Sequence, residues 1–298
     1  MRRVITRRDW LLSAFSSFVG MAISGRSAAA AACERSSVEG RMGKIEEESG
    51  GRLGVAILDT TTAVRIGHRS DERFPMCSTF KLLAVGAVLK RADQGREQLE
   101  RTVRFAQKDI VTYSPATEKR VDTGMSVKEL CAAAITLSDN TAANLLLASI
   151  GGPSGLTAFA RTLGDDVTRL DRIESELNEA LPHDPRDTST PDNMLSDLRE
   201  LVLGNALSLS SRSQLGDWLV HNKTGNKRLR AGVPAGWKVG DKTGSGARGT
   251  TNDLAILWPP QRGPILAAVY LTDTTADDDH RNGTIAAVGA EVAAADLH

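Results

Sequence analysis

A serine and a lysine three residues apart could form a nucleophile and its base. Ser78 and Lys81 open an apolar run over residues 80–89, which predicts a helix. Residues three apart lie on one face of a helix, so the Ser78 hydroxyl and the Lys81 amine can meet. A lysine whose pKa is lowered by burial can remove the proton from a serine hydroxyl. A helix N-cap followed by a surface lysine is the alternative interpretation.

A second polar group, Ser-Asp-Asn over residues 138–140, precedes another predicted helix. The Ser138 hydroxyl could relay a proton to a leaving nitrogen. The Asn140 amide could hold a substrate carbonyl. The tripeptide is also a common helix N-cap.

A third group ends a predicted strand, where Lys242, Thr243 and Gly244 stand together. A cation, a hydroxyl and a glycine that lets a ligand approach the backbone suit a substrate that bears a carboxylate. An edge strand that runs into a turn would have the same sequence.

The order of apolar periods predicts a mixed α/β fold. Strand patterns occur near both ends of the chain, and helical spacing dominates between them. We therefore expect one catalytic domain over residues 33–298 with two lobes. Residues 33–70 and 222–298 would form an α/β lobe with an antiparallel sheet and flanking helices, and residues 71–221 an all-helical lobe. The predicted strands are 53–59, 63–66, 237–244, 252–258 and 264–272, and a closing helix is expected over 285–297.

A long polar loop over residues 171–190 interrupts the helical region. Loops of this length in a compact domain are often functional. Arg172 and Asp187 could close its neck as an ion pair, although both could equally be solvated.

The overall charge excludes some functions. The 298 residues contain 37 Lys+Arg and 37 Asp+Glu, which gives no electrostatic reason to expect a nucleic-acid partner. The five histidines are scattered, so a zinc site and a Ser-His-Asp triad are both poorly supported. We expect no metal and no cofactor.

The first 32 residues predict an export signal. A basic start with the pair Arg7-Arg8 precedes a short apolar stretch and a run of alanines, a pattern typical of a secretory signal of the twin-arginine type. The stretch is too short for a stable membrane span. The expected location is periplasmic or secreted, with a lipid anchor at Cys33 as a lesser alternative.

The three polar groups occur in a specific order, about 60 and then about 100 residues apart. Ser-x-x-Lys, Ser-Asp-Asn and Lys-Thr-Gly in this order characterise class A β-lactamases and penicillin-binding proteins. Glu174 to Asn178 matches the E-x-x-L-N pattern that penicillin-binding proteins lack. Over roughly residues 36–296, the chain resembles a class A serine β-lactamase, which implies the two-lobed fold of that family and the penicillin-binding proteins.

The resemblance implies a role for each matched position. Ser78 would attack the lactam carbonyl, and either Lys81 or Glu174, acting through a water, would be the base for acylation. Glu174 and Asn178 would hold the water that hydrolyses the acyl-enzyme. Backbone N–H groups of Ser78 and Ser245 would form the oxyanion hole. The other implied roles are proton transfer for Ser138, side-chain amide binding for Asn140, carboxylate binding for Lys242, Thr243 and Ser245 beside Gly244, and lining of the entrance for Tyr113.

The sequence departs from the family pattern at several positions. Thr251 stands where many members have a carboxylate-binding arginine, and Arg228 matches an alternative source of the guanidinium. Ser175 follows Glu174 where many relatives have proline, so the bond between them could be cis or trans.

The cysteines lack their family partners. Cys77 and Cys131 match family positions, but Val85 and Gly246 stand where a bridging cysteine would be needed. Both thiols are therefore expected to be free, and the missing bridge at Gly246 counts against the carbapenem-hydrolysing branch.

The resemblance implies hydrolysis of penicillins and cephalosporins through a covalent serine acyl-enzyme, which confers antibiotic resistance. Partners would be small-molecule β-lactam substrates and inhibitors, and the enzyme is expected to be a monomer. A D-alanyl-D-alanine carboxypeptidase or penicillin-binding protein is the alternative enzyme. A β-lactam sensor domain without turnover is the alternative from another class.

Overall fold

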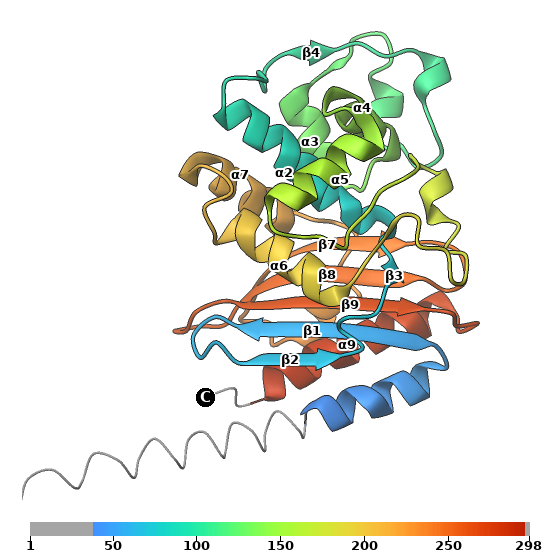
Figure 1. Cartoon of the computed structure of the whole chain (residues 1–298), viewed down its shortest axis with the longest axis vertical. Coiled ribbons are helices and arrows are strands. Elements are labelled where there is room, and N and C mark those ends of the chain that lie inside the picture. Colours follow the sequence, from blue (N-terminus) through green and yellow to red (C-terminus); the bar gives the residue numbers. More distant parts are fainter. Residues whose placement is uncertain (1–37, 296–298) are drawn as a thin grey trace, which may run out of the picture.

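A five-stranded antiparallel sheet lies at the centre of the molecule, with strand order β2-β1-β9-β8-β7 (Figure 1). The computed structural model describes residues 38–295. The strands are β1 (Arg52–Asp59), β2 (Arg65–His68), β7 (Lys238–Ser245), β8 (Thr251–Trp258) and β9 (Ile265–Thr272). The predicted mixed α/β class with an antiparallel sheet is confirmed, whereas the residue boundaries proposed for two lobes stay a prediction.

Helices cover both faces of the sheet (Figure 1). The helices from α2 to α7 lie on one side, and α8, α9 and a helix over residues 38–49 pack on the other. The helices are α2 (Phe80–Asp93), α3 (Val127–Thr136), α4 (Asn140–Ser149), α5 (Gly152–Thr162), α6 (Pro191–Val202), α7 (Leu209–Val220), α8 (Leu229–Gly232) and α9 (Asp278–Ala294). The short 3₁₀ turns are η1 (Cys77–Thr79), η2 (Gln107–Asp109), η3 (Thr117–Lys119) and η4 (Glu176–Asn178). The short strand pairs are β3 (Phe74–Pro75) with β6 (Thr188–Ser189), and β4 (Thr102–Val103) with β5 (Met125–Ser126).

Alternation along the strands produces two hydrophobic cores. On β8, Leu254 and Ile256 belong to the core shared with α2, α6 and α7, whereas Ala255 and Leu257 belong to the core under α9. Side chains of a strand point to opposite faces in turn, so a strand buried on both faces reads as a continuous apolar run.

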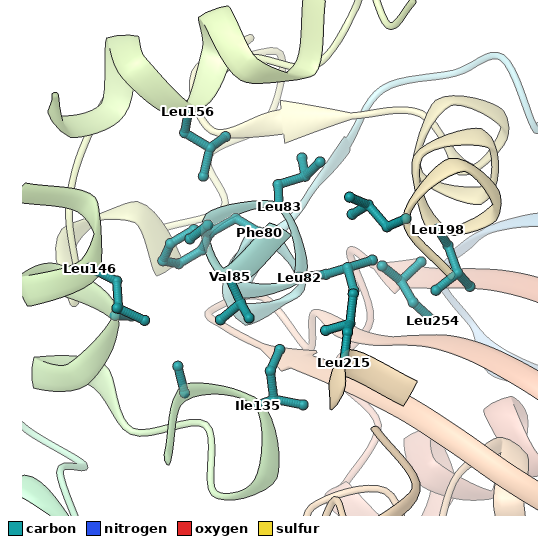
Figure 2. Close-up of a cluster of buried hydrophobic side chains, with 14 of the residues drawn as sticks. Phe80, Leu82, Leu83, Val85, Ile135, Leu146, Leu156, Leu198, Leu215 and Leu254 are labelled. Carbon is teal, nitrogen blue, oxygen red and sulfur yellow. The ribbon is translucent and has the colours of Figure 1, made fainter. Parts of the chain in front are cut away.

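Helix α2 is the best-buried helix of the larger core, and all residues from Phe80 to Leu89 are buried. Figure 2 shows Phe80, Leu82 and Val85 among leucines from the surrounding helices. Burying one large apolar side chain contributes about 1.5–3 kcal/mol. The helix that begins directly after Ser78 is therefore held firmly in place.

Two predicted elements are displaced in the structure. The second strand is β2 at Arg65–His68 rather than 63–66, and α9 begins at Asp278 rather than at 285. The side chain of Asp277 accepts a hydrogen bond from the His280 N–H at 2.8 Å and caps this helix. Acidic residues at a helix N-terminus interact favourably with the helix dipole. The first turns of α9 are therefore helical although they lack the apolar spacing from which the helix was predicted.

The predicted export signal and the Cys33 alternative lie outside the described residues. Within residues 38–295, no helix is long and apolar enough to cross a membrane.

Two buried carboxyl groups interact here: Asp165, which follows α5, and Asp197, which belongs to α6. Burial is the main cause that raises the pKa of Asp197 to about 9, and the charge of Asp165 is the next. The charge of Glu200 also raises this pKa, whereas the charge of Arg161 lowers it. Burial tends to raise the pKa of Asp165 as well, but hydrogen bonds from Thr168 outweigh it and lower that pKa. Asp197 is thus the partner that keeps its proton.

This pair predicts a pH-dependent stability. Unfolded Asp197 loses its proton near pH 3.8 and folded Asp197 near pH 9. The stabilisation from the retained proton is complete below the lower value and is lost as pH rises to the upper one, at up to about 1.4 kcal/mol per pH unit. Asp197→Asn keeps a hydrogen-bond donor toward Asp165 without a titration. We expect its free energy of unfolding in urea to fall less between pH 5 and pH 8 than that of the parent; parallel slopes would contradict this assignment.

Candidate active site

Ser78 lies in the 3₁₀ turn η1, which leads directly into α2. The amino end of a helix carries unpaired N–H groups and the positive end of the helix dipole, both suited to a developing oxyanion. The predicted meeting of serine and lysine is confirmed, because the Lys81 Nζ donates to Ser78 Oγ at 2.9 Å. Ser78 does not act as the N-cap of α2, since the residue before Phe80 is Thr79.

Lys81 is fully buried, and its amine contacts polar groups from several parts of the site. Its Nζ donates to Ser138 O at 2.8 Å and to Asn140 Oδ1 at 2.6 Å, and it forms an ion pair with Glu174 Oε1 at 2.9 Å. Burial lowers the pKa of Lys81, and the charge of Glu174 partly opposes that shift. A lowered pKa is what a lysine requires in order to accept a proton near neutral pH.

The Ser138 hydroxyl lies between two lysine amines. Lys242 Nζ lies 3.0 Å and Lys81 Nζ 3.3 Å from Ser138 Oγ. Burial, and then the charge of Lys81, hold the pKa of Lys242 well below its usual value. Ser138 has a φ of 56°, a conformation that non-glycine residues adopt mainly where function or packing demands it. This hydroxyl is well placed to pass a proton between a lysine and a substrate atom.

The Ser-Asp-Asn tripeptide serves both as a helix N-cap and as part of the site, through different residues. Asp139 caps α4, because its Oδ1 accepts the Ala142 N–H at 2.8 Å. Asn140 instead faces the site, where Oδ1 accepts from Lys81 and Nδ2 donates to Thr112 O at 2.8 Å. The cap therefore orients the amide and the hydroxyl that flank it.

Glu174 is buried and points at the serine. Ser78 Oγ lies 3.1 Å from Glu174 Oε1, and Asn178 Nδ2 donates to Glu174 Oε2 at 2.5 Å. Asn144 holds the backbone of Glu174 from both sides, with its Oδ1 2.9 Å from the Glu174 N–H and its Nδ2 2.8 Å from the Glu174 carbonyl. The bond between Glu174 and Ser175 is cis, which settles the alternative that the sequence left open.

Asn144 is a site residue that the sequence analysis missed. It follows Asn140 by one helical turn in α4 and so lies on the same face of the helix. That spacing is the one signal that could have revealed it.

The predicted ion pair at the neck of the 171–190 loop is confirmed. Arg172 Nε donates to Asp187 Oδ2 at 2.6 Å. Asp187 Oδ1 also accepts the N–H groups of Asp171 and Arg172, at 2.8 and 2.9 Å. The side chain of Asp187 is 1% exposed, so this clasp is a buried one.

Arg228 is buried against the strand that carries Lys-Thr-Gly. Its Nη2 donates to Ser245 Oγ at 2.6 Å, its Nη1 to Gly244 O at 2.8 Å, and its Nε to Asn282 Oδ1 at 2.9 Å. Burial lowers the pKa of Arg228, and the charge of Asp253 opposes this. Arg228 is therefore a buried residue of the site and not a solvated surface arginine. Asn282, on α9, is a second supporting residue that the sequence did not indicate.

Two glycines allow β7 and the turn after it to approach η1 and the loop. A Cβ on Gly244 would lie 2.8 Å from Met76 O, and one on Gly246 would lie 2.6 Å from Cys77 Sγ and 2.9 Å from Asn178 O. Gly244 is therefore required by the protein's own packing, a reason that adds to the ligand approach expected from the sequence. Both Cys77 and Cys131 are free and buried, as predicted.

These residues surround a cleft of about 470 Å³. Tyr113 lines this cleft with 57% of its surface exposed, so it is not a buried packing residue. Thr224, which the sequence did not indicate, shares a hydrogen bond of 2.5 Å with Thr243 across the cleft wall. The lining comprises Ser78, Tyr113, Ser138, Asn140, Asn178, Lys223, Thr224, Arg228, Thr243, Gly244 and Ser245. Lys81, Glu174 and Lys242 lie buried behind this surface.

Comparisons with known proteins agree with this geometry. The model of the β-lactamase enzyme family matches residues 37–295. The chain is 52% identical over 238 residues to β-lactamase FAR-1 of Nocardia farcinica, covering 79% of this chain and 76% of that protein. It is 50% identical over 245 residues to the carbapenem-hydrolysing β-lactamase KPC of Klebsiella oxytoca, covering 82% and 84%.

A solved structure gives the same result. The ancestral GNCA class A β-lactamase is 62% identical and superimposes with a TM-score of 0.85, covering 86% of this chain and 98% of that one. Sequence and fold thus agree over nearly all of the described residues. The chain belongs to the β-lactamase enzyme family and is a class A serine β-lactamase, an enzyme that hydrolyses the β-lactam ring.

Proposed function

We propose that the enzyme hydrolyses penicillins and cephalosporins with Ser78 as the nucleophile. The observation that carries this assignment is the convergence of Lys81 and Glu174 on the Ser78 hydroxyl in the cleft lining, with the Ser138 hydroxyl 3.3 Å from the same lysine amine. In the first step Ser78 Oγ bonds to the lactam carbonyl carbon, and its proton passes to Lys81 or, through a water, to Glu174. N–H groups of Ser78 and Ser245 stabilise the oxyanion.

Collapse of the tetrahedral intermediate breaks the lactam C–N bond. Ser138 gives its proton to the leaving nitrogen and is reprotonated from the lysines on either side of it. Glu174 then takes a proton from a water, whose oxygen bonds to the ester carbonyl carbon. The bond from that carbon to Ser78 Oγ breaks, and Ser78 Oγ takes up a proton from Glu174 or Lys81 beside it. Asn178 supports this step, because its Nδ2 donates a hydrogen bond to Glu174. Its buried Oδ1 has no hydrogen-bond partner among the described residues, so it can accept a hydrogen bond from the attacking water.

The substrate carboxylate would bind at the other end of the cleft. Thr243 and Ser245 offer hydroxyl groups, and Lys242 and Arg228 supply positive charge behind them. Asn140 would give up an internal hydrogen bond in order to bind the side-chain amide of the substrate. Tyr113 would line the entrance of the cleft. The relative KPC is named for carbapenem hydrolysis, but the lack of a cysteine at Gly246 favours penicillins and cephalosporins here.

We further propose that the enzyme acts as a monomer without a nucleic-acid partner; the balanced charge gives no reason to expect such a partner. We also propose that the twin-arginine signal in residues 1–32 directs export to the periplasm or the medium, as the Arg7-Arg8 pair indicates. N-terminal sequencing of the protein from the periplasmic fraction tests the signal and its cleavage.

Nitrocefin turnover tests the nucleophile. The mature enzyme should hydrolyse many equivalents, and Ser78→Ala should lose the activity by at least about 10³-fold, as expected when a catalytic nucleophile is removed. Ser213→Ala, which removes an exposed serine on α7, should keep the parent rate. A parent that consumes one equivalent and stops would favour the penicillin-binding or sensor alternatives.

A further inference from the structure

A second cavity lies behind the active site, beneath the 171–190 loop. Its volume is about 650 Å³, and we name it the rear cavity. Loop residues 180–185 form one wall, and the ends of β1 and β9 and the turn after β7 form the other, through Arg52, Asp273 and Arg248. No described residue lines both this cavity and the active-site cleft.

The rear cavity has three arginines and three carboxylates in its lining, but these groups are not all paired with one another. Each carboxylate already has an arginine partner. The pairs are Glu72 with Arg52 at 3.2 Å, Asp184 with Arg186 at 2.6 Å, and Asp273 with Arg248 at 2.9 Å.

Arg73 is the lining arginine without such a partner. Its guanidinium donates to Thr188 Oγ1 and to Val167 O, both at 3.0 Å, and among the described residues no carboxylate lies within ion-pair distance. Burial lowers the pKa of Arg73, and the charge of Arg169 adds to that shift. The Arg73 guanidinium is therefore part of the cavity lining and has no carboxylate paired with it among the described residues.

An apolar surface faces the same space. Leu181 is 46% exposed, which is unusual for a large aliphatic side chain in the described chain. Pro75, Pro182 and Pro185 also line the cavity. A cationic group beside apolar side chains suits a ligand with an anionic end and an apolar body.

We propose that the rear cavity binds a small organic carboxylate, with its anionic end on Arg73 and its apolar body on Leu181 and the adjoining prolines. An arginine fork can hold a carboxylate through two parallel hydrogen bonds. Such a ligand would supply the carboxylate partner that Arg73 lacks among the described residues.

Two chain segments connect this cavity with the active site. In the loop, Asn178 lines the cleft and residues 180–185 line the rear cavity. Ser245, the last residue of β7, lines the cleft, and Arg248 in the turn that follows lines the rear cavity. The Ala247 N–H joins the two segments by donating to Asn178 O at 2.9 Å. A bound carboxylate would restrict the segment that follows Asn178, and, resting on the proposed role of Glu174 and Asn178, it should change the deacylation rate by a few-fold.

Binding is best measured on enzyme whose Ser78 is blocked by a boronic acid, so that the active-site cleft is occupied. Titration with 2-naphthoate, followed by calorimetry and by amide NMR shifts, should show one saturable site with shifts at residues 180–185. Neutral 2-naphthamide should bind more weakly by at least about tenfold, because it lacks the charge-assisted hydrogen bonds.

Variants locate the site. Arg73→Gln should weaken naphthoate binding by at least about tenfold, and the matched control Arg104→Gln, which removes an exposed arginine outside the cavity, should leave it unchanged. Leu181→Asp places a negative charge at the exposed position and should also abolish binding, which keeps the test valid if Arg73→Gln unfolds.

Three results would overturn the proposal: no binding, equal binding to the Arg73 and Arg104 variants, which means an adventitious additive only, or binding that requires an unblocked Ser78. Nitrocefin turnover by the unblocked parent is measured separately. A failure of the rear cavity therefore remains distinct from a failure of the proposed hydrolysis.

Discussion

Glu174→Ala is expected to open a β-lactam once and then remain acylated on Ser78. The parent carboxylate lies 3.1 Å from Ser78 Oγ and is held by Asn178, where it can activate a water against the ester. Loss of a positioned general base costs about 10²–10⁴-fold in rate. Intact-mass spectrometry should show the protein plus one β-lactam for minutes to hours, with a single burst of nitrocefin hydrolysis.

The same variant separates the two candidate bases for acylation. The charge of Glu174 raises the pKa of Lys81, so its removal leaves the lysine more easily neutral. If Lys81 is the base for acylation, the burst in Glu174→Ala should stay fast. If Glu174 is that base, the burst should become slow, as deacylation does. Glu176→Ala changes an exposed carboxylate two residues away and should match the parent. Sustained turnover by Glu174→Ala would contradict its role.

Asp187→Ala is expected to be the most destabilising change in the 171–190 loop. It removes the buried partner of Arg172 and the acceptor for two backbone N–H groups. Arg172 keeps Glu179 as a second carboxylate partner at 2.5 Å, so the main cost comes from the two backbone N–H groups that lose their acceptor, at about 1–3 kcal/mol each. Urea unfolding of the mature protein should show this loss, and deacylation should slow because Glu174 lies on the loosened loop.

Asp184→Ala is the matched control for that experiment. It breaks an ion pair on the same loop, to Arg186, whose side chain is 44% exposed. A solvated pair contributes little to stability, so this variant should unfold at the parent's urea concentration. Equal destabilisation by both variants would show that the loop depends on its charges in general and not on the buried clasp.

The sequence was most informative where chemistry depends on local spacing. Ser78 and Lys81 meet because they are three positions apart across the η1 turn and the first turn of α2, a local geometry that the sequence spacing can predict. The apolar runs of β8 and β9 likewise predicted strands because both faces are buried.

Other features required the folded chain or a family pattern. Lys242 reaches Ser138 across a separation of more than 100 residues, which no local period can indicate. Their association was predictable from the order of three motifs and not from physical chemistry alone. Asn282 and the burial of Arg228 depend on how α9 packs against the sheet, and the first turns of α9 are too polar to show a helical apolar period.

The strand order has a consequence for how the protein is made. β9 is the last strand in the sequence, yet it lies between β1 and β8 in the sheet. Until residues 265–272 leave the ribosome, β1-β2 and β7-β8 are two separate hairpins, each with an unpaired inner edge that another chain could occupy. Joining them also closes a loop of about 200 residues, a slow step in folding. A nascent chain that stalls before β9 would therefore depend on chaperones to stay out of aggregates.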